Sequence, residues 1–426
     1  MKCKRVIAGA MAVAWLVACA SPSSVQPIPE LGSAYALEKD ELKLWNQSRD
    51  EERKLRQKLE LLEDPLLQDY VDSLGQGLVE PATRASGQLN FSFHVVEDPT
   101  INAFAFPHGS IYIHSGLIAR TESEAQLAMT LGHEISHVEQ RHALKHRRSA
   151  RNKAIGIGIA AAAASIIVAR EAGRKAEQGD FSSAAVISRT ADIILGVGLQ
   201  LAYIAAVQGY GRRLEREADE AGMAKLVSAG YDPREAPRLF AVLLQEHPDA
   251  GKVERFFFAS HPANEERRRT AEELLQTRYR VEAGSGTISS RDYELRRRLV
   301  VRHDARLNIE AGRLNLAEIQ IDQVLEATPR DPVALTLRGK LHKRRAANAA
   351  APEQKRAEQE VALEAYLEAI DADPALAEPR REVGLLLMQT GRREEAGEHL
   401  RRYLDLAPGA TDVQIIRDYL RELDAA

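Results

Sequence analysis

The sequence contains few cysteines, no strong excess of either charge, and no apolar stretch long enough for a standard membrane-spanning helix. Only Cys3 and Cys19 occur in 426 residues, and removal of a signal peptide would leave no pair for a disulfide. The formal net charge of −4 is mild for this length and gives no reason to expect a nucleic-acid partner. Apolar stretches at 6–18, 154–169 and 193–207 all fall short of about 20 residues. What remains is a chain long enough for two domains.

The N-terminus has the pattern of an exported bacterial lipoprotein. Residues 1–18 begin with basic side chains and continue with a short apolar stretch, as a secretory signal peptide does. The ending LVAC resembles a lipobox, which implies cleavage before Cys19 and lipid attached to it; ordinary cleavage nearby is the alternative. Ala20 favours the outer membrane by the same resemblance. We therefore predict a periplasmic, lipid-anchored protein with a Pro/Ser-rich tether at 19–36.

The stretch TLGHEISHVEQRH at 130–142 has the spacing of a metal-binding helix. His133 and His137 are four residues apart, so both imidazoles can reach one ion from the same helix face. Glu134 can reach a water at that ion and act as general base. On a continuous helix His142 would lie on the opposite side from His133, and we predict a structural role for it.

Because HExxH also occurs by chance, the interpretation depends on a third ligand. An HExxHxxGxxH arrangement is excluded, since Gln140 and Ala143 stand where glycine and histidine would be. The other familiar solution takes a glutamate from a later helix.

The segment GRRLEREADEAGMAKLVSAGYDP at 211–233 predicts such a helix, stopped by a glycine. Glu215 and Asp219 share a face, so the first can bind the ion and the second can hold a ligand histidine's other ring nitrogen. The small residues Ala218 and Gly222 near that face allow another helix to approach closely. By itself the segment could equally be a solvated charged helix, with Glu217 pointing elsewhere.

Four segments, in this order, resemble peptidase family M48, which includes HtpX-like and BepA-like zinc metallopeptidases. They are INAFAFPHGSIYIHSGLI at 101–118, HEISHVEQRH at 133–142, EREAD at 215–219 followed by AGYDP, and SHP at 260–262 followed by an arginine at 267. The resemblance implies an endopeptidase with one zinc ion per chain. It implies specific roles for seven residues: His133, His137 and Glu215 as ligands, Glu134 as catalytic base, Asp219 beside the ligands, His261 on a gating loop, and Arg267 as an accessory residue.

The region before the metal helix predicts a small sheet. Residues 88–98 alternate like a strand, and so does GSIYIHSG at 109–116. A strand edge beside the zinc can bind an extended peptide through its backbone, which suits unfolded polypeptide and predicts weak side-chain selectivity. With a helical pattern at 37–79, the fold class is mostly α (α+β), and the peptidase domain covers 37–281. The residues assigned to the substrate strand are Asn102, Ala103, Phe104, Ile111, Tyr112 and Ile113.

Two of the apolar runs, 154–169 and 193–207, separate the metal-site segments. HtpX-like proteins are integral membrane proteins, so a transmembrane hairpin is one interpretation. Both runs are short and rich in alanine and glycine, and Gln200 interrupts the second. We favour two buried or interfacial helices packed on the metal helix.

The C-terminal third, 292–426, predicts a solenoid of tetratricopeptide repeats after a Gly/Ser linker at 282–291. AGRLNLAEIQIDQVLEATP aligns with TGRREEAGEHLRRYLDLAP, and Pro374 and Pro408 are 34 residues apart, which is the repeat period. Gly339 and Gly384 keep the register, each ten residues after a proline. A low-complexity insert at 344–356 explains the one longer spacing, and a helix at 412–424 closes the array. An unrelated helical bundle is the alternative.

Together these patterns predict a periplasmic zinc endopeptidase that degrades misfolded or stalled envelope proteins, with a repeat arm that docks substrate or partner. The order of its parts resembles BepA-like proteins, which implies outer-membrane assembly machinery as a partner, although the lipobox and the lack of internal disulfides differ. Two alternatives stay open. The protein is a chaperone or scaffold that cleaves little, or it is a membrane-spanning HtpX-like protease.

Overall fold

A computed structural model describes residues 25–151, 211–245 and 265–424. Within these ranges no helix is both long enough and apolar enough to cross a bilayer. Three predictions fall outside the described residues: the signal peptide with lipidation at Cys19, the two apolar runs between 154 and 207, and the gating role of His261.

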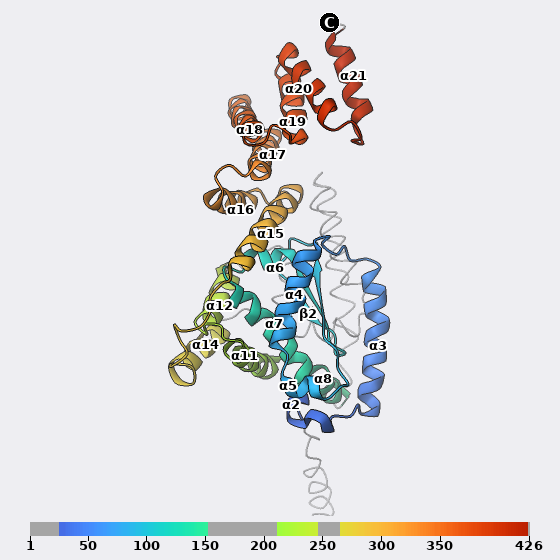
Figure 1. Ribbon diagram of the computed structural model, residues 1–426, viewed down its shortest axis with the longest axis vertical. Coiled ribbons are helices and arrows are strands. Elements are labelled where there is room, and N and C mark those ends of the chain that lie inside the picture. Colours follow the sequence, from blue (N-terminus) through green and yellow to red (C-terminus); the bar gives the residue numbers. More distant parts are fainter. Residues whose placement is uncertain (1–24, 152–210, 246–264, 425–426) are drawn as a thin grey trace, which may run out of the picture.

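The chain forms a core of helices around a small sheet, followed by an all-helical arm (Figure 1). This confirms the predicted fold class, which is mostly α with one small sheet. The core helices are α2 (Ile28–Leu31), α3 (Lys39–Arg56), α4 (Pro65–Leu78), α5 (Pro81–Ala85), α6 (Ser115–Arg120), α7 (Glu124–Glu139), α8 (His142–Arg151), α11 (Gly211–Ser228), α12 (Glu235–Gln245) and α14 (Glu265–Thr277), with a short 3-10 turn η1 (Gly32–Ala34).

The sheet contains β1 (Ser92–Val96), β2 (Ala103–Ala105) and β3 (Ser110–His114) in the order β1-β3-β2. β3 runs parallel to β1, with Phe93 opposite Ile111, and antiparallel to β2, with Ala103 opposite Ile113. Successive side chains point to opposite faces. Phe93, Ile111 and Ile113 join the main core with α4 and α7, whereas Tyr112 packs with the end of α3 on the other face.

The prediction that Ser110–His114 offers a free edge to substrate is wrong, because β3 is the middle strand. Ile111, Tyr112 and Ile113 have neighbours on both sides and are fully buried. Within the described residues the outer strands of the sheet are β1 and β2, and β2 contains Ala103 and Phe104 and packs beside α7.

The motif helix α7 is buried along its whole length. The Ser123 hydroxyl caps its N-terminus by accepting a hydrogen bond from the backbone N–H of Gln126 at 3.2 Å. Helix α11 packs directly against α7, and Gly132 and Gly222 meet where they cross. A Cβ added to Gly222 would lie 3.1 Å from the backbone nitrogen of His133. The predicted close approach of the two helices is therefore confirmed.

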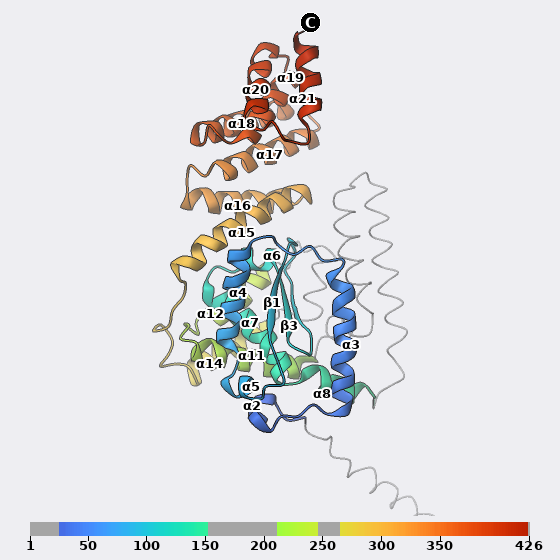
Figure 2. The ribbon, with the colours of Figure 1, turned by 45° about the vertical axis from the view of Figure 1, so that its right-hand side comes forward.

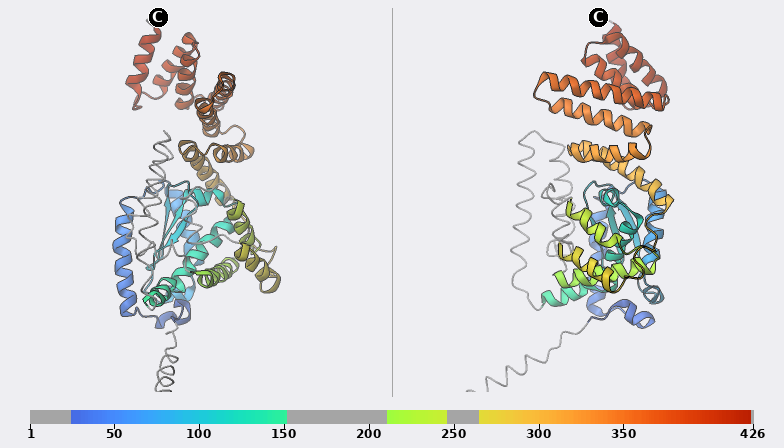
Figure 3. Two further views of the ribbon diagram at one scale, coloured as in Figure 1. Left: turned by 180° about the vertical axis from the view of Figure 1, so that it is seen from behind. Right: turned by 90° about the vertical axis from the view of Figure 1, so that its left-hand side faces the viewer.

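The arm is a stack of helix pairs that leads away from the core (Figures 2 and 3). Glycines make the pairs close: a Cβ on Gly339 would lie 2.4 Å from the ring of Tyr366, and one on Gly384 would lie 2.6 Å from Leu400. The predicted insert 344–356 forms no separate loop but lengthens two paired helices. The arm helices are α15 (Arg291–Glu310), α16 (Leu314–Ala327), α17 (Pro332–Asn348), α18 (Pro352–Ala372), α19 (Ala377–Gln389), α20 (Arg393–Leu406) and α21 (Val413–Asp424).

The segment predicted as a linker, 282–291, packs closely on the core. The carbonyl of Ile288 accepts a hydrogen bond from the backbone N–H of Ala125 at 3.0 Å, at the start of α7. Gly286 lies so close to Tyr231 that a Cβ would be 2.3 Å from its backbone carbon. The arm therefore begins from a fixed segment that contacts the first turn of the motif helix.

Candidate active site

Two histidines and one glutamate converge where α7 crosses α11. The Nε2 atoms of His133 and His137 are 3.0 Å apart. The Glu215 carboxylate approaches both, at 3.4 Å from Nε2 of His133 and 3.6 Å from Nε2 of His137. All three side chains are buried, and they are the one group in the described part of the chain whose His, Cys, Asp or Glu donor atoms are arranged to hold a metal.

The other ring nitrogen of His133 is held by a charged pair. Its Nδ1 lies 2.9 Å from a carboxylate oxygen of Asp219. The Arg267 guanidinium donates to both Asp219 oxygens, at 2.8 and 2.6 Å, and lies over the Phe240 ring. Because α11 supplies Asp219 and α14 supplies Arg267, three helices fix one imidazole. The structure thus places Asp219 at the outer ring nitrogen of His133 and Arg267 against Asp219.

These charges decide the ionisation of the group. Burial opposes ionisation of Asp219, but the Arg267 guanidinium and His133 outweigh burial and hold the Asp219 pKa below its usual value. Burial and Arg267 also oppose a charge on His133, yet hydrogen bonds to Asp219 and Glu215 prevail and raise the pKa of His133 to about 9. The pocket therefore favours positive charge at His133, which a proton or a metal cation can supply.

Behind His137 the structure differs from the prediction for His142. Helix α7 ends at Glu139, and Arg141 adopts a left-handed backbone with a φ of 57° before α8 begins at His142. Because the chain turns here, His142 does not have the position that it would have on a continuous helix. His142 Nδ1 lies 2.9 Å from His137 Nδ1, and His142 Nε2 lies 3.2 Å from a Glu217 oxygen. Glu217, predicted to point elsewhere, is thus linked to the site.

Glu134 borders a cavity beside the three clustered side chains. The cavity is also lined by His133 and Arg267, and Glu134 is 2% exposed. Its other walls are mostly apolar: Leu117, Met129, Thr130, Leu239, Phe240 and Leu243. A carboxylate at such a place can take a proton from a water and release it again, next to two imidazoles and another carboxylate.

A buried pair of histidines on one helix, a carboxylate from a second helix and a neighbouring carboxylate define a metal-dependent hydrolase of the HExxH type. Residues 65–275 match Peptidase family M48, and the chain therefore contains a metallopeptidase domain of this family. This confirms the resemblance found in the sequence motifs.

Named relatives agree with that assignment. A protein provisionally named beta-barrel assembly-enhancing protease in Vibrio cholerae is 35% identical over 217 residues, 50% of this chain and 40% of the relative. The beta-barrel assembly-enhancing protease of Escherichia coli is 32% identical over 218 residues, with the same coverage. The mitochondrial metalloendopeptidase OMA1 of Schizosaccharomyces pombe is 28% identical over 194 residues, 46% of this chain and 49% of the relative. The matches span less than half the length of these relatives.

Proposed function

We propose that the protein is a zinc-dependent endopeptidase. The convergence of His133, His137 and Glu215 supports this most strongly. Two neutral imidazoles and a carboxylate are a donor set that catalytic zinc uses, with a fourth position left for water. The contact of His133 with Asp219 through Nδ1 fits this, because it leaves Nε2 as the ligand atom on the side of Glu215.

Each residue then has a chemical task. Zinc held by the three donors would polarise the scissile carbonyl and acidify a water molecule. Glu134 takes the proton of the attacking water and delivers it to the departing amine. Asp219 keeps His133 in the required tautomer, and Arg267 keeps Asp219 ionised and fixed. His261 would gate the site, as the family resemblance implies.

The edge strand β2 offers a place for an extended substrate. Asn102 accepts a hydrogen bond from the backbone N–H of His114, and Phe106 donates to Ser110, so even-numbered positions of this stretch bond to β3. By the alternation of antiparallel strands, the backbone groups of Ala103 and Ala105 point away from β3. We assign polypeptide recognition to this edge, which would form hydrogen bonds with the substrate backbone and select weakly among substrate side chains.

The arm provides the second contact with large substrates or partners. Stacked helix pairs form extended surfaces suited to protein segments. By analogy with the named relatives, we propose that the protein degrades misfolded or stalled envelope proteins, in the periplasm and anchored by lipid at Cys19, and that the arm meets outer-membrane assembly machinery. Nucleic acid has no part in this function.

Metal content and casein cleavage test the proposal on the protein lacking its N-terminal segment. We expect one zinc per chain and cleavage in the wild type. Glu134→Gln should keep zinc and lose cleavage by about 10²-fold or more, whereas Glu215→Gln should lose both. Wild-type protein that takes up no zinc in metal-replete buffer would overturn the proposal. Normal envelope quality control in cells carrying Glu134→Gln would favour the chaperone alternative.

A further inference from the structure

The far side of His137 contains a row of polar groups that the proposed reaction does not yet use. From the metal-facing side outward, the order is His137, His142 and Glu217. His142 is completely buried and His137 is 2% exposed. The contacts along the row are 2.9 Å between the two Nδ1 atoms and 3.2 Å between His142 Nε2 and Glu217. Buried polar atoms normally have hydrogen-bond partners, and here the two ring nitrogens of His142 join His137 to Glu217.

The hydrogen positions follow from the ligand atom. Since Nε2 of His137 faces Glu215 and His133, its Nδ1 must carry the hydrogen in a neutral imidazole. His142 Nδ1 then accepts that hydrogen, and His142 Nε2–H donates to the Glu217 carboxylate. One consistent set of donors and acceptors runs through the row, and it requires neutral His142 and ionised Glu217.

Two cations fix the outer end of the row. Lys145 Nζ lies 3.0 Å from the Glu217 oxygen that contacts His142, and Arg213 donates to the other oxygen at 2.8 Å. Glu217 therefore lies between one imidazole and two cationic side chains, which hold its carboxylate in place.

The turn that aims His142 is itself held in place. A left-handed backbone at a residue other than glycine is strained, and it persists where surrounding contacts fix it. The Arg141 side chain donates to Glu41 at 2.8 Å and to Glu38 at 2.8 Å, and it lies over the Tyr35 ring. Contacts from the N-terminal part of the core thus define where α8 starts and where His142 points.

We propose that His142, anchored by Glu217, is a positioning residue that fixes the tautomer and ring orientation of His137 for zinc. The inference rests on the proposed zinc site. It makes the two ligand histidines unequal, since His133 has a carboxylate as direct partner and His137 reaches a carboxylate through a second imidazole. Partners of this kind typically change metal affinity about 10- to 100-fold when they are removed.

Three substitutions at position 142 separate the elements of this proposal. His142→Leu removes both contacts. His142→Asn places an oxygen near the position of Nδ1 and keeps an acceptor for His137, whereas His142→Gln keeps reach toward Glu217 and misplaces that acceptor. The control is His146→Leu, one turn further along α8, where Nδ1 is buried with no hydrogen-bond partner among the described residues.

The measurement is the zinc dissociation constant of each full-length variant, by competition with a chromogenic chelator, together with the visible absorption of the cobalt-substituted protein. We expect His142→Leu and His142→Gln to bind zinc about tenfold or more weakly, with a shifted cobalt spectrum. His142→Asn should stay within a few-fold of wild type, and His146→Leu should match it.

Equal zinc affinity and identical cobalt spectra for wild type and His142→Leu would overturn the inference and leave the zinc site intact. Absence of zinc in the wild type would instead remove the proposed function. Urea unfolding of the metal-free proteins reports whether each variant folds. If His142→Leu does not fold, the Asn and Gln variants still decide, because a purely space-filling role predicts no preference for an acceptor at the Nδ1 position.

Discussion

The peptidase core and the outer repeats of the arm differ in how their buried polar groups are arranged. In the core, polar side chains from α7, α11 and α14 converge on one point, and all of them are less than a tenth exposed. In the outer repeats the interior is mainly alanine, leucine, valine and tyrosine, such as Ala362, Tyr366 and Leu386, and the buried Glu382 carboxylate pairs with Lys343 at 2.6 Å. Burying polar groups costs free energy unless each has a partner, so the core depends on the pairing within its polar cluster, whereas the outer repeats depend mainly on apolar packing.

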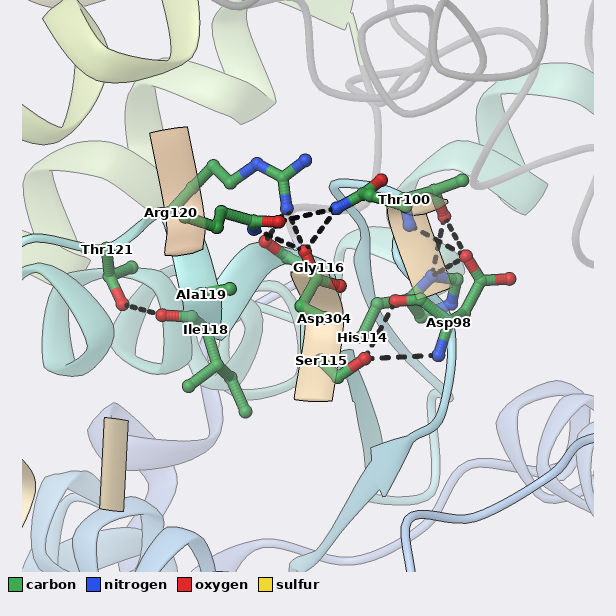
Figure 4. A network of polar contacts seen from close by, with 12 residues as sticks. Asp98, Thr100, His114, Ser115, Gly116, Ile118, Ala119, Arg120, Thr121 and Asp304 are labelled. Carbon is green, nitrogen blue, oxygen red and sulfur yellow. Dashed lines mark hydrogen bonds and ion pairs between the residues drawn. The ribbon is translucent and has the colours of Figure 1, made fainter. Parts of the chain in front are cut away.

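The arm also contains a buried polar cluster, which lies where it joins the core. Asp304 of α15 is fully buried and accepts hydrogen bonds from Asn308 at 2.9 Å and Gln320 at 2.6 Å. The same carboxylate pairs with Arg120 of α6, the helix between β3 and the motif helix (Figure 4). Thr121 adds a 2.7 Å contact to Tyr293 of α15. The arm is thus fixed to the segment that links the sheet to the active site.

The largest effect should come from replacing glycine by valine, in one variant in the core and in another variant in the arm. Gly222→Val places methyl groups against the His133 backbone and separates the ligand-bearing helices, so we expect cleavage to fall about 10²-fold or more. Gly339→Val crowds Tyr366 in the arm and should lower the melting temperature while leaving zinc stoichiometry at one. Zinc content, peptide cleavage and calorimetry measure both. Equal loss of zinc in the two variants would contradict the separation of roles.

Asp219→Asn tests how far the charged pair behind His133 supports the site. The amide still accepts a hydrogen bond but no longer neutralises the buried Arg267, so zinc affinity should fall about 10- to 100-fold. The measurement is the same chelator competition. Glu220→Gln, one residue further on the same helix, is the control and should behave like wild type. An unchanged zinc affinity for Asp219→Asn would show that His133 needs no charged partner.

Arg120→Met tests the junction. It leaves the Asp304 carboxylate buried without its cation, which typically costs about 3–5 kcal/mol of unfolding free energy. We expect casein cleavage to fall more than cleavage of a short peptide, because the core keeps its site while the arm loses its fixed position. The double variant Arg120→Met/Asp304→Leu should recover most of the stability, since replacing a whole buried pair is often neutral. If the double variant did not recover stability, the loss in Arg120→Met would have a cause other than the unpaired Asp304 carboxylate.

The smallest effect concerns acid stability on the α3 face of the core. Burial opposes ionisation of Glu52, but hydrogen bonds from His108 and Tyr112 lower its pKa to about 2. The folded pKa is below the unfolded one, so its stabilisation is complete above about pH 4.5 and is lost as pH falls toward 2. Glu52→Gln should make the free energy of unfolding less dependent on pH in this range, as measured by urea unfolding at several pH values. An unchanged slope would exclude Glu52 as its source.

Much of this site was predictable from local spacing. The four-residue interval between His133 and His137, and again between Glu215 and Asp219, places each pair on one helix face whatever the rest of the fold does. Gly222 predicted the close approach of another helix because it has no side chain to keep the helices apart. The repeat glycines Gly339 and Gly384, each ten residues after a proline, likewise predicted the helix pairs through their register.

The errors share one cause, which is that local periodicity does not report strand neighbours or breaks in a helix. Tyr112 and its neighbours have the alternation of a strand, but only the pairing with β1 and β2 shows that this strand is central. His142 was misplaced because nothing in the sequence around Arg141 is typical of a left-handed turn. That conformation depends on Glu38 and Glu41, about a hundred residues earlier in the chain.

The sequence by itself determined the class of chemistry and the order of the two domains, because ligand spacing and repeat period are local properties of helices. Only the tertiary structure decided how the site is supported. The contacts of Arg267, His142 and Glu217 depend on distances between separate helices. Such distances depend on how those helices pack, and packing depends on side chains far apart in the sequence.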